Sequence, residues 1–177
     1  MIVKLLLEHD ADPNYNGHIG KSPLRCTIDI EIIKILLKYG AKVDCRDFIQ
    51  ITPLMNALDC KQFEWAKLYL EHGANINHCR NDGRTALHEA SITGKLQTIE
   101  FLLKHGANIE AIDEYKCTPL HLAARNDGPL WVENEHKEQP DAVKILLKNG
   151  ANPNLKDIDL KTGLQYAVEG RHYEICS

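Results

Sequence analysis

Nine histidines and six cysteines are the residues of this chain that could carry out chemistry, because imidazoles and thiolates bind metals and act in catalysis. A zinc site on one helix requires two histidines four positions apart, as in H-E-x-x-H. Glu89 directly follows His88, and no second histidine lies at that spacing. The sequence also contains no paired C-x-x-C, no G-x-x-x-x-G-K-[ST] and no G-x-S-x-G motif. We therefore expect no catalytic residue, no metal and no cofactor in this chain.

The bulk composition narrows the class of partner. The chain carries a net charge of −4, a pI near 6.1 and no run of lysine or arginine, which argues against nucleic-acid binding. The cysteines are irregularly spaced and follow no secretory leader, so we expect a reducing compartment, the cytoplasm, rather than a disulfide framework. The nucleus, or the host cytosol for a pathogen protein, is the alternative. The apolar stretch 2–7 is too short for a membrane span and is expected to be a helix fragment, so no membrane partner is expected.

The strongest pattern in the sequence is an internal repeat. A period of 33 residues separates Thr52, Thr85 and Thr118, and the same period separates Gly40, Gly73 and Gly106. Self-similarity at such a period is typical of stacked repeat arrays. The clearest copy is 81–112, and the rest of the chain consists of imperfect copies of it.

Each period contains the signals of two short helices. Thr85 is suited to cap the first helix, and in the next copy Thr118 is followed by Pro119, which favours the first helical position. The second helix, near 96–104, carries leucine and isoleucine at spacings of three and four. One helix pair alone cannot bury this apolar stripe, so neighbouring repeats must cover it. Gly106 suits a left-handed helix stop, and 107–110 is predicted to be an extended strand that leads into a turn.

These segments resemble ankyrin repeats. The resemblance is carried by TALHEA at 85–90, TPLHLAA at 118–124, and the tails HGANIN, HGANIE and NGANPN. It implies an all-α solenoid of stacked helix pairs, with projecting β-hairpin loops and a concave protein-binding surface. His88 and His121 occupy the family's T-P-L-H position, where the imidazole is expected to hydrogen-bond within the repeat. The histidines at the ends of the second helices are expected to interact with the last carbonyls.

The resemblance covers nearly the whole chain, which we expect to be one array over 1–177. Its predicted parts are a partial repeat at 1–19, repeats at 20–49, 50–82, 83–115 and 116–159, and a partial repeat at 160–177. The repeat at 20–49 is three residues short near 27–29, and the repeat at 116–159 carries 11 additional residues at 128–138. Because both end repeats are partial, we expect a monomeric array within a longer protein.

The resemblance also implies contact residues at the family's variable positions, on the hairpin tips and at the ends of the first helices. Carried onto this sequence, they are Phe48, Ile49, Ile51, Asn81, Asp82, Arg84, Ile92, Thr93, Glu114, Tyr115, Cys117, Arg125, Asn126, Ile158, Asp159 and Lys161. Tyr115 with Arg84 and Arg125 offers the aromatic and guanidinium chemistry that is common in interface hot spots. For each of these residues, ordinary solvated surface is the alternative.

The insert at 128–138 has a composition of its own. Trp131 lies between Leu130 and Val132, beside several glutamates, so an exposed Trp131 would make the insert a second contact site. A Trp131 packed against the helices would make it a structural patch. Because lengthening a surface loop costs little, about 0.6 kcal/mol per doubling, a loop without any use is a further alternative.

We expect a protein-protein interaction module or scaffold with a protein partner. The alternative is the substrate-recruiting part of a ubiquitin-ligase adaptor, or the ankyrin part of a channel, a signalling protein or an enzyme whose other domains lie outside this chain. The flanking segments would distinguish these. Hairpin asparagines of the family are hydroxylated in some members, and Asn14, Asn77 and Asn154 match that position loosely.

Overall fold

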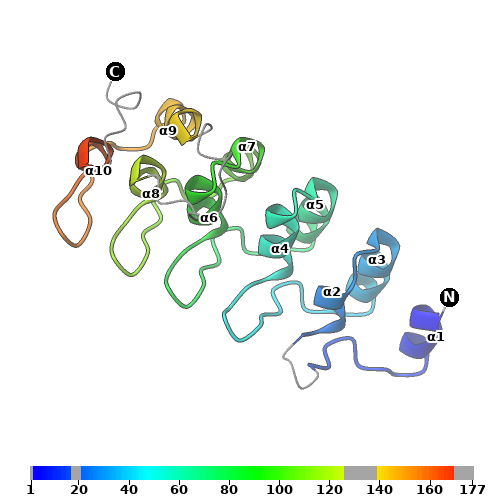
Figure 1. Cartoon of the computed structure of the whole chain (residues 1–177). Helices are drawn as coiled ribbons and strands as arrows, with labels where there is room; N and C mark the ends of the chain where they lie inside the picture. The colour runs from blue at the N-terminus through cyan, green and yellow to red at the C-terminus, as the bar shows by residue number, and fades with distance from the viewer. Residues whose placement is uncertain (1, 17–20, 126–138, 170–177) are drawn as a thin grey trace. The chain divides into compact units, whose positions relative to one another are not determined.

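The computed structural model describes residues 2–16, 21–125 and 139–169 (Figure 1). Ten helices lie in this part of the chain: α1 Ile2–Glu8, α2 Pro23–Cys26, α3 Ile30–Lys38, α4 Pro53–Asp59, α5 Phe63–Glu71, α6 Ala86–Ile92, α7 Leu96–Lys104, α8 Pro119–Arg125, α9 Gln139–Lys148 and α10 Gly163–Glu169. The chain divides into two compact units, Met1–Asn75 (the first unit) and Ile76–Ser177 (the second unit). The all-α class implied by the resemblance is confirmed, while the repeat boundaries stay a prediction.

Hydroxyl residues begin the first helix of each pair, as the sequence predicts. Ser22, Thr52 and Thr85 are the N-caps of α2, α4 and α6, and Thr118 and Thr162 directly precede α8 and α10. The cap of α6 is reciprocal. The Thr85 side chain accepts from the backbone of His88, and the His88 ring accepts from the Thr85 N–H.

Each second helix stops at a glycine in the left-handed conformation. The φ values of Gly40, Gly73, Gly106 and Gly150 are +85°, +83°, +84° and +92°. Asp10, which stands where the other copies have glycine, adopts the same conformation with φ +64°. The expected histidine contacts at these helix ends are also present. Nδ1 of His72 lies 2.9 Å from the Leu68 carbonyl, and Nδ1 of His105 lies 2.8 Å from the Phe101 carbonyl.

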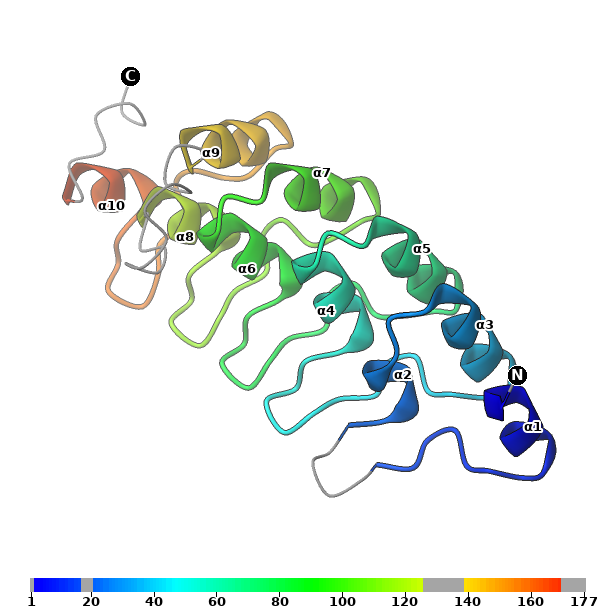
Figure 2. The ribbon, with the colours of Figure 1, turned by 45° about the vertical axis from the view of Figure 1, so that its right-hand side comes forward.

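Helices of the second unit form two rows. In both views α6, α8 and α10 lie in one row and α7 and α9 in the other (Figure 1, Figure 2), and α8 packs against α6, α9 and α10. Leu87, Ile99, Leu102 and Leu146 are at most 1% exposed. Ala123 on α8 is fully buried, and its small side chain lets the first helices approach closely. The apolar stripes are therefore covered by neighbouring helices, as the spacing predicts.

The first unit contains the shortened repeat. Here α4 packs on α5, and α1 and α2 each pack on α3. The predicted deletion shortens the first helix, because α2 has 4 residues where α4, α6 and α8 have 7. The aromatic residues of α5 belong to the packing, with Tyr69 buried and Trp65 half-buried. Burial raises the pKa of Tyr69 to about 12.

The loops between helix pairs project from the helices without forming a sheet. Within the described ranges no strand is present, and one isolated antiparallel bridge joins Cys79 and Thr85. The strand predicted at 107–110 is wrong, because this stretch ends in a turn at 109–110. Asn108 Oδ1 accepts the Glu110 N–H at 3.0 Å, so the side chain satisfies the backbone locally in place of a strand partner.

At an equivalent position after α1, α3, α5 and α7, a side chain ties one repeat to the next. Its oxygen accepts a backbone N–H from the following repeat in four pairs: Asn14 to Lys42 at 2.7 Å, Asp44 to Asn75 at 3.2 Å, Asn77 to Asn108 at 2.7 Å, and Glu110 to Asn152 at 2.6 Å. Asn, Asp and Glu can all present such an oxygen. The side-chain oxygens of Asn14 and Asn77 therefore serve in packing, and any hydroxylation of these residues stays a prediction.

Apolar side chains are exposed on the helices at both ends of the described chain. On α1, Ile2 is 76% exposed and Leu5 and Leu6 are 56% exposed, and on α10 Leu164 is 59% exposed. The insert at 128–138, with Trp131, lies outside the described residues, so its alternatives stay predictions. The next element, α9, begins at Gln139.

Candidate functional site

Four loop tips share one backbone geometry, over 47–51, 80–84, 113–117 and 157–161. In each tip the first N–H donates to the carbonyl of the fifth residue, at 3.4, 2.9, 3.0 and 3.0 Å respectively. The fourth residue is left-handed in all of them: Gln50, Gly83, Lys116 and Leu160 have φ between +58° and +77°. A turn followed by a left-handed residue is a common way to close a loop of this length. The tips therefore present their central side chains to solvent from a defined backbone.

An aspartate begins three of the four tips. Oδ1 of Asp113 accepts the N–H groups of Tyr115 and Cys117, both at 2.9 Å, and Asp47 and Asp157 make the equivalent pairs. Aspartate at the first position of a turn stabilises it in this way. Sequence reasoning missed these residues, although the spacing of Asp47 and Asp113 is twice the period.

Consecutive tips of the second unit are joined by backbone hydrogen bonds. The Glu114 N–H donates to the Asp82 carbonyl at 3.1 Å, and the Ile158 N–H donates to the Tyr115 carbonyl at 2.9 Å. Tyr115 and Ile158 are 54% and 55% exposed. These two predicted contact residues therefore lie side by side on neighbouring tips.

Two buried histidines fasten the tips to the first helices. Nδ1 of His88 accepts from the Thr85 N–H at 3.1 Å, so its Nε2–H donates to the Cys117 carbonyl at 3.0 Å. His121 repeats this arrangement, with Nε2 3.1 Å from the Lys161 carbonyl of the next tip and 2.9 Å from the Leu155 carbonyl. Burial lowers the pKa of His88, which keeps the ring neutral. The predicted structural role of the T-P-L-H histidines is confirmed.

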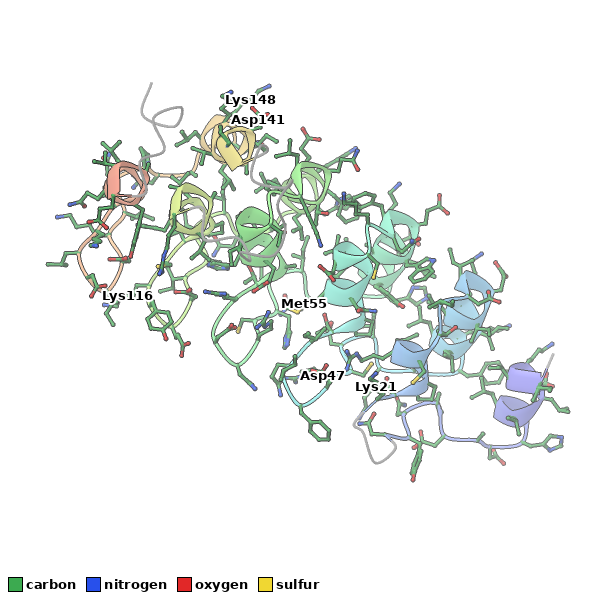
Figure 3. The ribbon with its side chains drawn as sticks, in the orientation of Figure 1. Lys21, Asp47, Met55, Lys116, Asp141 and Lys148 are labelled. Atoms are coloured by element: carbon green, nitrogen blue, oxygen red, sulfur yellow. The ribbon has the colours of Figure 1, made fainter. Side chains whose placement is uncertain are left out.

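Two other residues occupy the histidine position in the first unit. Arg25 forms an ion pair with Asp47 on the following tip, with Nη1 2.9 Å from Oδ2. Met55, on α4, has no polar hydrogen to donate (Figure 3). The side chain that links a first helix to the following tip is therefore histidine in two repeats and arginine in another. Met55 cannot donate a hydrogen bond of this kind.

Cys117 is not a contact residue. Its side chain is 2% exposed, its N–H is held by Asp113, and its Sγ lies 3.9 Å from Oδ2 of Asp157. Burial, with the carboxylates of Asp113 and Asp157, raises the pKa of Cys117 to about 12. The prediction is wrong because the tip folds this side chain inward under the neighbouring loop.

The remaining predicted contact residues differ in exposure. Phe48 and Ile49, at a tip of the first unit, are 73% and 52% exposed, and Ile51 beside them is half-buried. Solvent-exposed positions also include Asn81, Glu114, Arg125 and Asp159, while Asp82, Arg84, Ile92, Thr93 and Lys161 are half-buried. Asn126 and Trp131 lie outside the described residues.

Three of the predicted residues line one pocket in the second unit. Arg84 from a loop tip, Ile92 from the end of α6, and Arg125 from the end of α8 surround a space of about 130 Å³, together with Leu122. Leu122 was missed by sequence reasoning. It stands one period after Glu89, which a comparison of successive repeats could have identified. The pocket, which we call the arginine pocket, combines two guanidinium groups with an aliphatic wall.

Carboxylates surround Arg84 without binding it closely. Its Nε lies 3.6 Å from Asp113 Oδ2 and 4.0 Å from Asp82 Oδ2, and its Nη1 lies 3.8 Å from Glu89 Oε1. Arg80 competes for two of these acids, at 3.2 Å from Asp82 and 3.0 Å from Glu89. All three distances from Arg84 exceed hydrogen-bond length. The acids therefore orient the Arg84 guanidinium and leave it able to donate hydrogen bonds.

Tyr166 supports the other arginine. The guanidinium carbon of Arg125 and Nζ of Lys161 both lie 5.4 Å from the centre of the Tyr166 ring. The Tyr166 hydroxyl donates to Asp157, and burial together with this hydrogen bond raises the pKa of Tyr166. Tyr166 was not among the predicted residues, because its sequence position alone does not show that it meets α8.

In the described part of the chain, no group of three or more His, Cys, Asp or Glu side chains is close enough to hold a metal ion. Among those same residues, no helix has the length and apolar character needed to cross a membrane. The cysteines Cys26, Cys45, Cys60, Cys79 and Cys117 are free thiols.

Comparison with known proteins gives consistent matches. A family model described as ankyrin repeats in three copies matches residues 54–157. The chain is 33% identical to the transient receptor potential cation channel subfamily A member 1 homolog of Caenorhabditis elegans, over 88% of this chain and 12% of that protein. It is 31% identical to inversin of Homo sapiens, over 76% of this chain and 15% of inversin. It is 26% identical to an ankyrin repeat protein of Acanthamoeba polyphaga mimivirus, over 97% of this chain and 33% of that protein. The chain therefore spans at most 33% of the length of these relatives.

Proposed function

Because the chain belongs to the ankyrin repeat family, we propose that it is a protein-protein interaction module that binds a protein partner through its loop tips and the ends of its first helices. Ankyrin repeats generally mediate contacts between proteins, and the family is typically non-catalytic. The partner, the scaffold role and a cytoplasmic location are part of this proposal.

One observation supports this proposal above the others: the predicted contact residues Arg84, Ile92 and Arg125 line a single pocket, although they come from three different segments. Tyr115, on the tip that follows Arg84 by one repeat, is 54% exposed. Arginine and tyrosine are enriched among the residues that dominate binding energy in interfaces. The exposed Phe48 and Ile49 of the first unit extend the proposal to a second set of tips.

The alternative proposal is that this binding module is one part of a larger protein. The observation that favours it is the coverage of the relatives, since the chain matches only 12% of a channel homolog and 15% of inversin. In that case the repeats would recruit a partner to domains outside this chain. A ubiquitin-ligase adaptor, a channel and a signalling protein remain the alternatives, and the flanking sequence would distinguish them.

Affinity capture from cell lysate tests the proposed surface. Wild type is compared with a Tyr115→Ala, Arg125→Ala double variant, and both are first checked for equal thermal stability. The control is an Asp141→Ala, Lys148→Ala double variant on α9, which lies on the side of the second unit away from the tip that carries Lys116 (Figure 3). We expect proteins retained by wild type and the control to be lost from the first variant.

An unchanged set of captured proteins would contradict the assignment of this surface. Recovery of nucleic acid alone would contradict the class of partner. A loss that the control variant shares would indicate a general effect on folding instead of a contact.

A further inference from the structure

We propose that the arginine pocket receives a carboxylate side chain of an acidic segment in the partner protein, with an adjacent aliphatic side chain packed on Ile92 and Leu122. This inference rests on the proposed function, because it names the chemistry of the ligand at the same surface. The occupant is an Asp or Glu next to an aliphatic residue.

The size of the pocket limits the ligand. Its volume of about 130 Å³ is well below the roughly 300–1,000 Å³ of small-molecule sites. A single amino-acid side chain fits such a space, whereas a nucleotide or another cofactor does not. The pocket is therefore suited to anchor one residue of a longer segment.

The donors of Arg84 select the chemistry of that residue. Among the described residues, the nearest carboxylate oxygens lie 3.6, 3.8 and 4.0 Å from its nitrogens, so an incoming carboxylate can approach more closely than these three acids do. Guanidinium donors and carboxylate oxygens have matched planar geometry. Arg125 adds a second positive charge, and its position over Tyr166 orients the guanidinium.

The local charge balance favours a carboxylate over a phosphate. Arg84 lies among the acids Asp82, Glu89 and Asp113, two of which also pair with Arg80, and Arg125 lines the same pocket. A phosphate group carries about −1.5 to −2 charges and would meet repulsion from three carboxylates. A single negative charge gains the two guanidinium contacts with less repulsion.

The apolar wall requires a second feature of the ligand. Ile92 is half-buried and contributes most of the accessible aliphatic surface beside the guanidinium groups, while Leu122, which is 4% exposed, also lines the pocket. A lone carboxylate such as acetate would leave this surface in contact with water. A carboxylate followed by leucine or isoleucine would cover it.

Titration with defined peptides tests the inference. The full chain is labelled with ¹⁵N, and its Arg Nε–H signals and the amides of Ile92 and Leu122 are followed as capped tetrapeptides are added. The probes are acetyl-Ala-Glu-Leu-Ala-amide and its analogues with Gln, Lys or phosphoserine in place of Glu. We expect saturable shifts with the Glu peptide, at least about 10-fold weaker binding of the Gln and Lys peptides, and no tighter binding of the phosphoserine peptide.

Matched variants assign the effect to the pocket. Arg84→Gln and Arg125→Gln should each weaken binding of the Glu peptide by about 10-fold or more, as expected for the loss of a charge-assisted contact. Lys148→Gln removes the same charge from the exposed end of α9, away from the tip that carries Lys116 in the same unit (Figure 3), and should leave binding unchanged. Arg125 is exposed, so its variant remains informative if Arg84→Gln unfolds the chain.

Two results would overturn the inference: no shift with the Glu peptide up to about 10 mM, or equal weakening by Lys148→Gln. Tighter binding of the phosphoserine peptide would also overturn it and would assign the pocket to phosphorylated ligands. If the peptide fails while lysate capture still depends on Tyr115 and Arg125, the acidic ligand is wrong and the proposed function stands. If both fail, the surface itself is wrong.

Discussion

At the scale of single residues, the left-handed position of each loop tip has different consequences in different repeats. Gln50, Lys116 and Leu160 adopt this conformation despite their side chains. At Gly83, a second constraint besides the positive φ favours glycine. A Cβ on Gly83 would lie 2.9 Å from the Glu114 nitrogen on the next tip. The close contact between neighbouring tips therefore depends on the absence of a side chain here.

We predict that Gly83→Ala destabilises the second unit more than Gly106→Ala. The two glycines have similar φ values, +77° and +84°, but a Cβ on Gly106 would meet nothing within 4 Å. Gly106→Ala should cost about 1–2 kcal/mol for backbone strain alone, and Gly83→Ala should cost at least about 1 kcal/mol more for the clash. Urea unfolding followed by circular dichroism measures both. Equal costs would show that the tips move apart freely.

His88 should make stability depend on pH. Burial lowers its pKa in the folded state below the ordinary histidine value of 6.5, so the unfolded chain binds the proton more readily. Its contribution is therefore fully present above about pH 6.5 and is lost as the pH falls below that value towards the folded pKa. We predict that the free energy of unfolding falls between about pH 7.5 and about pH 5, and that His88→Gln reduces the slope.

Glutamine is a conservative test at this position, since Gln165 occupies the equivalent place in α10 and its Oε1 accepts the Thr162 N–H at 2.9 Å. An unchanged slope in His88→Gln would mean that the ring does not titrate differently in the two states.

At the scale of elements, the apolar stripe of each second helix must face its neighbours. Leu146 and Leu147 are adjacent on α9, yet Leu146 is fully buried and Leu147 is 43% exposed. We predict that Leu146→Ala costs about 2–5 kcal/mol and Leu147→Ala less than about 1 kcal/mol. Chemical denaturation of the two variants measures the difference. Similar costs would mean that the face of α9 assigned here to the core, the one that carries Leu146, is wrong.

At the scale of the whole molecule, stability should vary along the chain. Leu7 is the buried residue of α1, and Ile2, Leu5 and Leu6 expose apolar surface, whereas α6 and α7 bury residues on several sides. In repeat proteins, stability is approximately a sum of local and nearest-neighbour contributions. We predict faster amide exchange in α1 than in 87–103, measured by mass spectrometry on the intact chain. Uniform protection would contradict this gradient.

Much of the fold could be predicted because each repeat contains the same local sequence signals. The hydroxyl caps, the glycine stops and the buried leucines follow from backbone geometry and from a spacing of three and four, which need no knowledge of distant contacts. The strand predicted at 107–110 failed for a local reason as well, since Asn108 satisfies the backbone within the turn.

The sequence by itself therefore determined the repeat family, the helix positions and the structural role of His88 and His121, and it predicted which segments could face a partner. Only the tertiary structure decided which of those side chains meet. Arg84 and Arg125 line one pocket with Ile92, Cys117 turns inward against Asp157, and Tyr166 supports Arg125. The physical reason is that a loop side chain takes its direction from the turn that holds it and from the repeat packed beside it, and neither is encoded in the 33-residue period.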